Sequence, residues 1–135
     1  MATLYRAAAN AKQVMWMQRV WIGLGALAGL GAVAMAAVTA HALPDEAARA
    51  AAASGVQMQG WHALALLGTG LWAPRGGWLA NLAGAAFVLG LLAFCGAVYA
   101  LAFAGIHLGP LAPIGGTTLM LGWLLLGLSA LHPRA

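Results

Sequence analysis

Three long stretches of this chain carry no charged side chain, and this feature constrains the fold more than any other. Neither acidic residues nor Lys or Arg occur in residues 20–44, 50–74 and 76–133. Charged residues make up only 6% of the 135 residues, against about a quarter in soluble globular domains. Because a helix needs roughly 20 apolar residues to cross about 30 Å of hydrocarbon, the three stretches are predicted to hold membrane spans.

Turn-forming residues divide these stretches into four predicted spans, at about residues 20–40, 56–73, 78–105 and 113–131. The predicted fold is therefore all-α, an integral membrane four-helix bundle over residues 20–131 with a short C-terminal tail at 132–135. The second span has to begin near residue 56, because residues 61–72 alone would rise only about 17 Å. The first apolar run is about 21 residues long, beyond the 7–15 typical of a signal peptide, so we expect it to be retained as a span.

Residues 1–19 are more polar than the predicted spans and form a predicted N-terminal arm. If helical, this arm is weakly amphipathic, and Arg6, Lys12 and Arg19 are its basic side chains. Such a helix lies on a membrane surface, where basic side chains reach the lipid headgroups, or docks on another protein. We expect these three residues to contact the membrane surface or a partner.

The polar segment after the first span predicts a short interfacial helix between spans one and two. Pro44 suits a first helical position, and Asp45 and Glu46 favour the positive end of the helix dipole. Ser54-Gly55 is the predicted end of this helix.

The distribution of basic residues predicts the orientation in the membrane. With four spans both termini lie on one side of the membrane. Five of the six basic residues are on that side: Arg6, Lys12, Arg19, Arg75 and Arg134. Arg49 alone is on the other side. Lys and Arg are enriched in cytoplasmic loops, so both termini are predicted to be cytoplasmic.

Small and turn-forming residues mark two predicted packing sites. Gly25 and Gly29 form a Gly-x-x-x-Gly pair in the first span, a pattern that allows close helix packing in lipid. The uncharged segment before the fourth span holds Pro113, Gly115 and Gly116, and irregular backbone there has to be buried by protein or reached by water.

Three histidines are the candidate ligand-binding residues. His41 ends the first span, His62 lies about 9 Å inside the second, and His107 lies in the turn before the fourth. The predicted topology puts all three near the exterior leaflet, where imidazoles could bind haem, a quinone or a metal. The favoured interpretation is structural: His62 forms a hydrogen bond with Tyr99, Thr117 or a backbone carbonyl and holds helix ends together.

Several short segments together resemble the DUF423 family of small membrane proteins of unknown function. They are Ala40-His41-Ala42-Leu43, residues 61–67 beginning Trp61-His62, Phe94-Cys95-Gly96 with Tyr99, Pro113-Ile114-Gly115-Gly116 and Gly122-Trp123-Leu124. The resemblance covers about residues 20–131 and implies a four-span protein of bacteria or mitochondria. Two features depart from the family pattern: the added N-terminal arm, and Gln59, which stands where another histidine is expected.

The residues that catalysis would need are missing from the predicted spans. No carboxylate lies within them, and no hydrolase, phosphate-binding or dinucleotide-binding motif occurs in the sequence. The basic residues are scattered rather than clustered, which disfavours nucleic acid as a partner. We therefore expect neither an enzyme nor a resident cofactor.

The favoured function is that of a structural or accessory subunit of a membrane assembly, or of a self-associating bundle. The alternative is a ligand-binding protein, or a small-solute or proton transporter, that uses the exterior histidines. The expected partners are the lipid bilayer and either a membrane protein or a second copy of the chain. The expected location is the bacterial inner membrane, and a mitochondrial membrane is the less favoured alternative.

Overall fold

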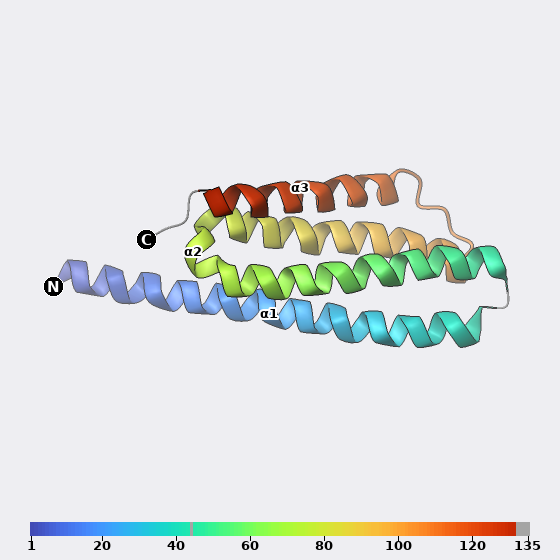
Figure 1. The fold of residues 1–135 in the computed structure, drawn as a ribbon, viewed down its shortest axis with the longest axis horizontal. Helices are drawn as coiled ribbons and strands as arrows, with labels where there is room; N and C mark the ends of the chain where they lie inside the picture. Colours follow the sequence, from blue (N-terminus) through green and yellow to red (C-terminus); the bar gives the residue numbers. More distant parts are fainter. Residues whose placement is uncertain (44, 132–135) are drawn as a thin grey trace.

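Three long helices make up almost the whole structure, a computed structural model that describes residues 1–43 and 45–131, without the side chains of residues 2–4 and 6–11. They are α1 (Ala2–Ala42), α2 (Glu46–Ala104) and α3 (Leu111–Leu131) (Figure 1). Each is long and apolar enough to cross a membrane. All three therefore qualify as membrane spans by length and composition.

Helix α2 folds back on itself at Gly77. Its backbone there has φ 61° and ψ −139°, which is not helical and which only glycine adopts readily. Pro74 lies just before the bend and cannot donate a backbone hydrogen bond. The two arms of α2, residues 46–76 and 78–104, consequently run side by side, and Tyr99 on the second arm donates a hydrogen bond to Gln59 on the first.

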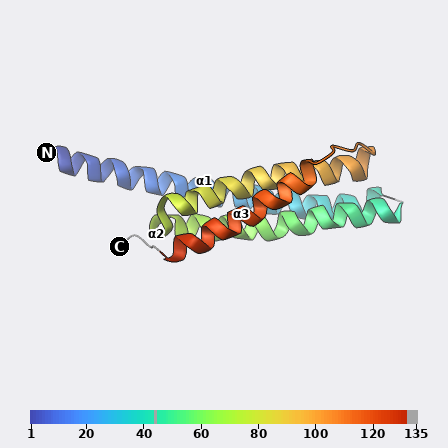
Figure 2. The same cartoon turned by 90° about the horizontal axis from the view of Figure 1, so that it is seen from above.

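Helices α1 and α3 pack on α2 from different sides. Within the described residues each contacts α2 and neither contacts the other. Figure 1 shows α2 between them, and Figure 2 shows α3 crossing α2 obliquely. The α2 arms thus form the centre of the molecule, and the N-terminal end of α1, the bend of α2 and the C-terminal end of α3 lie at the same end (Figure 1).

Small side chains fill much of the interior. Ala52, Ala80 and Ala83 are fully buried, whereas many leucines, such as Leu64 and Leu92, are exposed on the outer faces. In lipid an exposed leucine costs nothing, while alanine and glycine allow helix backbones to approach closely. Larger side chains complete the core where the α2 arms meet α1 and α3, chiefly Trp21, Leu66, Phe87, Leu91 and Leu119.

The predicted four-span bundle is wrong: the described residues form three candidate spans, not four. The predicted second and third spans belong to one helix, α2, because helical backbone continues through Arg75 and is interrupted only at Gly77. The boundary predicted between the spans that end at residue 73 and begin at residue 78 does contain the bend at Gly77.

The expected N-terminal arm and short interfacial helix are also not separate elements. Alanine-rich residues continue α1 without a break from Ala2, in keeping with the high helix propensity of alanine. Asp45 caps α2 by accepting a 2.7 Å hydrogen bond from the Ala48 amide, so the helix begins at Glu46. It does not stop at Ser54-Gly55, where Gly55 instead makes room for the Tyr99 ring. Pro44 lies outside the described residues.

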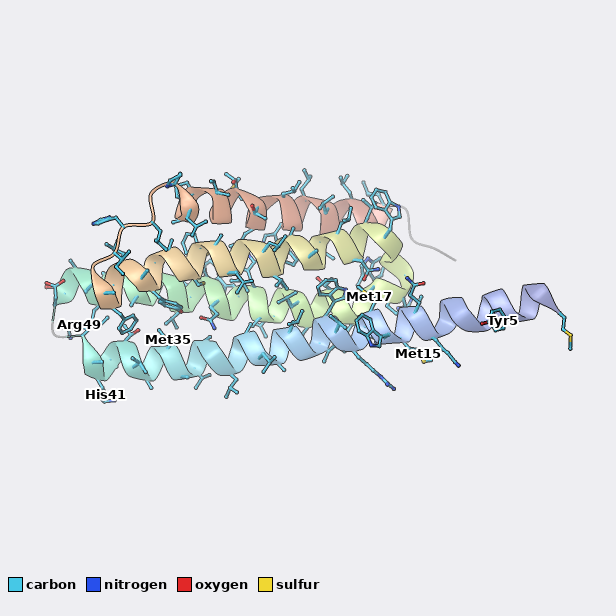
Figure 3. The ribbon with its side chains drawn as sticks, turned by 180° about the vertical axis from the view of Figure 1, so that it is seen from behind. Tyr5, Met15, Met17, Met35, His41 and Arg49 are labelled. Atoms are coloured by element: carbon cyan, nitrogen blue, oxygen red, sulfur yellow. The ribbon has the colours of Figure 1, made fainter. Side chains whose placement is uncertain are left out.

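The N-terminal part of α1 extends beyond the rest of the molecule (Figure 1). Packing against α2 begins near Gln13, which shares a small cavity with Pro74 of the α2 bend. The preceding residues add about 16 Å of helix, at 1.5 Å per residue. Tyr5, on this extension, is 79% exposed, and Figure 3 shows it far from the α2 arms.

Candidate functional site

His62, on the first arm of α2, lies in the interior, where its ring faces the second arm and α3. Its side chain is only 3% exposed. The ring Nδ1 is 2.7 Å from the carbonyl oxygen of Met58, one helical turn earlier, and the indole Nε1–H of Trp123 on α3 donates to Nε2 at 3.1 Å. Phe87, on the second arm, packs against both rings, with centroids 5.5 Å from His62 and 5.3 Å from Trp123.

These two hydrogen bonds define the state of the imidazole. An indole N–H can only donate, so Nε2 of His62 has to carry a lone pair, and a carbonyl can only accept, so Nδ1 has to carry the proton. The ring is therefore the neutral Nδ1–H tautomer. A metal ion or haem iron at Nε2 would first have to displace Trp123, which makes this arrangement a helix contact rather than an open ligand site.

Gln59 forms a second polar junction, between α1 and both arms of α2. Its Nε2 donates to the carbonyl oxygen of Ala28 on α1 at 3.0 Å. Its Oε1 accepts from the hydroxyl of Tyr99 on the second arm at 2.8 Å. One turn away, the Cys95 thiol donates to the Gly55 carbonyl at 3.5 Å. The residue that stands where a histidine was expected thus connects three helical segments.

Two further tryptophans connect helices in the same way. Trp21 of α1 donates its indole N–H to Asn81 Oδ1 at 2.7 Å, and the Asn81 amide donates to the Gly77 carbonyl at the bend. Trp72 donates to the Ser129 hydroxyl of α3 at 2.9 Å. Among the described residues Thr39 is the exception, since its buried hydroxyl oxygen has no hydrogen-bond partner.

The structure does not bring the three candidate histidines together. His41 is exposed in the last turn of α1, His107 is exposed in the loop between α2 and α3, and His62 lies deep in the bundle. His62 is 16 residues beyond the start of α2, about 24 Å of helix rather than the expected 9 Å. Within the part of the chain that the structure describes, no group of three His, Cys, Asp or Glu side chains could hold a metal ion.

The predicted packing residues differ in what surrounds them. A Cβ on Gly25 would lie 2.9 Å from the Ala63 carbonyl oxygen, whereas a Cβ on Gly29 would lie at an ordinary 3.7 Å from the Ala63 side chain. A Cβ on Gly115 would collide with the backbone of Phe94, and one on Gly116 would only touch its ring. Pro113 is exposed, and its carbonyl accepts from Thr117.

Two of the three basic residues predicted to contact a membrane surface or partner are visible as exposed side chains. Lys12 and Arg19 are both exposed on α1. The side chain of Arg6 lies outside the described residues.

An open groove of about 390 Å³ runs between α1 and α2. Leu24, Leu27 and Ala28 of α1 line one side. The second arm of α2 supplies the other side, from Val88 to Tyr99, and Gln59 lies at the same end as Tyr99. This groove combines an apolar length with a polar end, and no charged residue lines it.

Most of these residues could be named from the sequence, but their pairing could not. Tyr99, Thr117 and a backbone carbonyl are the predicted partners of His62; the Met58 carbonyl fills that role, while Tyr99 bonds to Gln59 and Thr117 to its own helix. Trp123 as the second partner was missed. The sequence did carry a signal for this pair. A polar side chain inside an uncharged span needs a hydrogen-bond partner, and tryptophans in the other spans can donate one.

Comparison with known proteins identifies the chain's relatives. Residues 35–116 match the DUF423 family, whose description is 'protein of unknown function'. A UPF0382 membrane protein of Haemophilus influenzae is 32% identical over 123 residues, covering 88% of this chain and 99% of that protein. A UPF0382 membrane protein of Staphylococcus epidermidis is 34% identical over 117 residues, covering 84% of this chain and 96% of that protein. No solved structure matches the chain.

Proposed function

The chain belongs to the DUF423 family of proteins of unknown function, and on that premise we propose that it is a structural or accessory membrane protein that docks on a partner. Its similarity to bacterial membrane proteins confirms the expected resemblance and the membrane location in general terms. The finer assignment, to an inner membrane with the Gly77 end in the cytoplasm, is part of this proposal and rests on the excess of basic residues at that end.

The observation that carries the proposal is the use of the interior polar side chains. His62, Gln59 and Asn81 each connect helices through hydrogen bonds to tryptophan, tyrosine or backbone partners. Catalysis or proton-coupled transport needs a group that is free to bind substrate or change its charge. Side chains held between two partners are suited to fixing helix positions instead, so we expect no resident haem, quinone or metal on His62.

The extension of α1 is the feature that a partner protein would use. It lies beyond the packing of the other helices, and it carries exposed Tyr5. Next to it, Met15 and Trp16 are exposed large side chains. Their neighbours Val14 and Met17 line a cavity together with Pro74 and Gly77 of the α2 bend. An exposed aromatic and basic helix end next to a membrane surface suits contact with another membrane protein or with a second copy of this chain.

Photo-crosslinking in living cells tests this proposal. A photoreactive phenylalanine analogue at Tyr5 should give one discrete crosslinked product, whose mass distinguishes a second copy from a different protein. The same analogue at Leu30, an exposed residue in the middle of α1, is the matched control and should give only diffuse lipid adducts. A partner identified from the Tyr5 product should no longer co-purify with a chain that lacks residues 2–12, and the deletion should not lower the thermal stability of the bundle. A protein that gives no discrete product from Tyr5 and purifies as a monomer would refute the proposed docking role.

A further inference from the structure

The groove between α1 and α2 has the size and lining of a small-molecule site. Its volume of about 390 Å³ falls within the roughly 300–1,000 Å³ of ligand pockets, which are mostly apolar with a few polar groups that fix orientation. Along the second arm of α2 it runs from Tyr99 to Val88, 11 residues or about 16 Å. Its elongated shape suits a chain better than a compact ring system.

The length of α3 indicates the membrane depth of the groove's polar end. Gly115 of α3 packs against Phe94, so Leu111, four residues earlier, is about level with Tyr99, five residues beyond Phe94 on the antiparallel second arm. The 21 residues of α3 rise about 31 Å, close to the hydrocarbon thickness of about 30 Å. An α3 that spans the hydrocarbon from end to end places the Gln59–Tyr99 pair at the depth of the first polar atoms of a lipid.

Gln59 and Tyr99 keep hydrogen-bonding capacity after binding each other. A glutamine amide has two N–H donors and two acceptor positions, of which Gln59 uses one of each. The Tyr99 oxygen can also still accept. Since no charged side chain lines the groove, a charged headgroup would gain nothing there, whereas an uncharged carbonyl could accept from Gln59.

We propose that this groove is a specific lipid site, in which one acyl chain of a membrane glycerolipid lies along α2 and its ester carbonyl, next to Tyr99, accepts from the second N–H of Gln59. The surrounding membrane supplies this ligand in excess, with its ester groups at the depth of the polar pair and its chains at the depth of the apolar length. The ligand covers the Gln59 junction on the lipid side, so the proposed site also shields the hydrogen bonds between α1 and the two α2 arms.

Gly96 allows the groove to be filled without disturbing the fold. A Cβ on Gly96 meets no atom within 4 Å, and the residue lines the groove. Gly96→Leu therefore places a leucine in the space of the acyl chain. Gly23→Leu is the matched control, because a Cβ on Gly23 also meets nothing within 4 Å and Gly23 lines none of the cavities described. Leu92→Trp is a second filling variant at the same groove.

The test uses the full chain in vesicles of phosphatidylethanolamine and phosphatidylglycerol, with a phosphatidylethanolamine that carries a diazirine in one acyl chain. After illumination, mass spectrometry should locate the adducts on the second arm of α2. Gly96→Leu and Leu92→Trp should reduce these adducts several-fold, and Gly23→Leu should leave them unchanged. Unchanged adducts in both filling variants that retain the wild-type helical content would overturn the site.

The carbonyl contact is tested by competition with unlabelled lipids of equal chain length. A diester phosphatidylethanolamine should compete about threefold better than its diether analogue, the factor for one hydrogen bond of about 0.6 kcal/mol in a bilayer. Gln59→Leu should abolish this preference. Equal competition by both lipids would refute the carbonyl contact, and stronger competition by a menaquinone would assign the groove to a quinone instead of a glycerolipid.

Discussion

Replacing Trp123 by phenylalanine isolates the hydrogen bond that ties α3 to His62. The substitution removes the indole N–H but keeps an aromatic ring next to Phe87. Trp123 is 50% exposed, so the loss of packing is modest. His62 Nε2, in contrast, is left as a buried acceptor without a donor.

The magnitude follows from that burial. An unsatisfied buried polar group costs about 1–3 kcal/mol in soluble proteins, while hydrogen bonds between membrane helices average about 0.6 and reach about 1.7 kcal/mol. We expect Trp123→Phe to lower the free energy of unfolding by about 1–2 kcal/mol. His62→Leu leaves the indole N–H of the half-exposed Trp123 unpaired, while the Met58 carbonyl keeps its backbone hydrogen bond within the helix. The cost of unpaired polar groups should therefore be smaller for His62→Leu than for Trp123→Phe.

A double-mutant cycle gives the coupling directly. The free energy of unfolding of the wild type, Trp123→Phe, His62→Leu and the double variant is measured by titrating mixed micelles with a denaturing detergent. The expected coupling energy is about 0.6–1.7 kcal/mol. Trp61→Phe, the same change at a 56% exposed neighbour of His62, should cost less than about 0.5 kcal/mol. A coupling near zero, with Trp123→Phe no worse than Trp61→Phe, would refute the reasoning.

Three further predictions concern packing, the bend and the orientation. Gly25→Val should destabilise the protein by about 1–3 kcal/mol because its side chain meets a backbone carbonyl, whereas Gly29→Ala should be neutral or stabilising; thermal unfolding of the pair checks this contrast. Gly77→Ala should cost about 1–3 kcal/mol in the same assay, because an alanine is strained at φ 61° and ψ −139°. In a background without the native cysteine, an impermeant maleimide added to intact cells should label Leu108→Cys and not Arg75→Cys; the reverse pattern would invert the proposed orientation.

The class of the protein and the position of its bend could be predicted from sequence. The long uncharged stretches predicted helices in a membrane, and the Pro74–Gly77 segment predicted a turn where Gly77 leaves helical backbone. The number of spans could not be predicted in this way. Only Gly77 leaves helical backbone between residues 46 and 104, so α2 counts as one element although its two arms lie side by side. Ser54-Gly55 carries the signature of a helix end, but the helix continues there and the Tyr99 ring packs on Gly55.

The pairing of the helices was beyond the sequence because these helices are apolar on all faces. In a soluble helix, alternating polar and apolar faces show which side is buried, whereas here the outer surface is apolar as well. Small residues such as Ala63 lie inside and Leu64 lies outside, which is the reverse of the order expected from hydrophobicity alone. The exposure of His41 and His62 depended on the same unknown rotation, and of these two only His62 proved to be buried.

The lack of distinct polar and apolar helix faces explains why the interior hydrogen bonds are spread over four separate junctions. Faces of alanine and glycine allow close approach but fit one another at several rotations and registers, so packing alone leaves alternatives close in energy. A hydrogen bond such as Trp21 to Asn81 or Trp72 to Ser129 is possible at one register only. In lipid a misplaced polar group finds no water, and each wrong register therefore leaves both partners unsatisfied. With junctions on α1, on both arms of α2 and on α3, the polar side chains select one arrangement of all the helices. In the described chain, the lipid-facing groove and the extension of α1 then remain suited to binding a lipid and a partner protein.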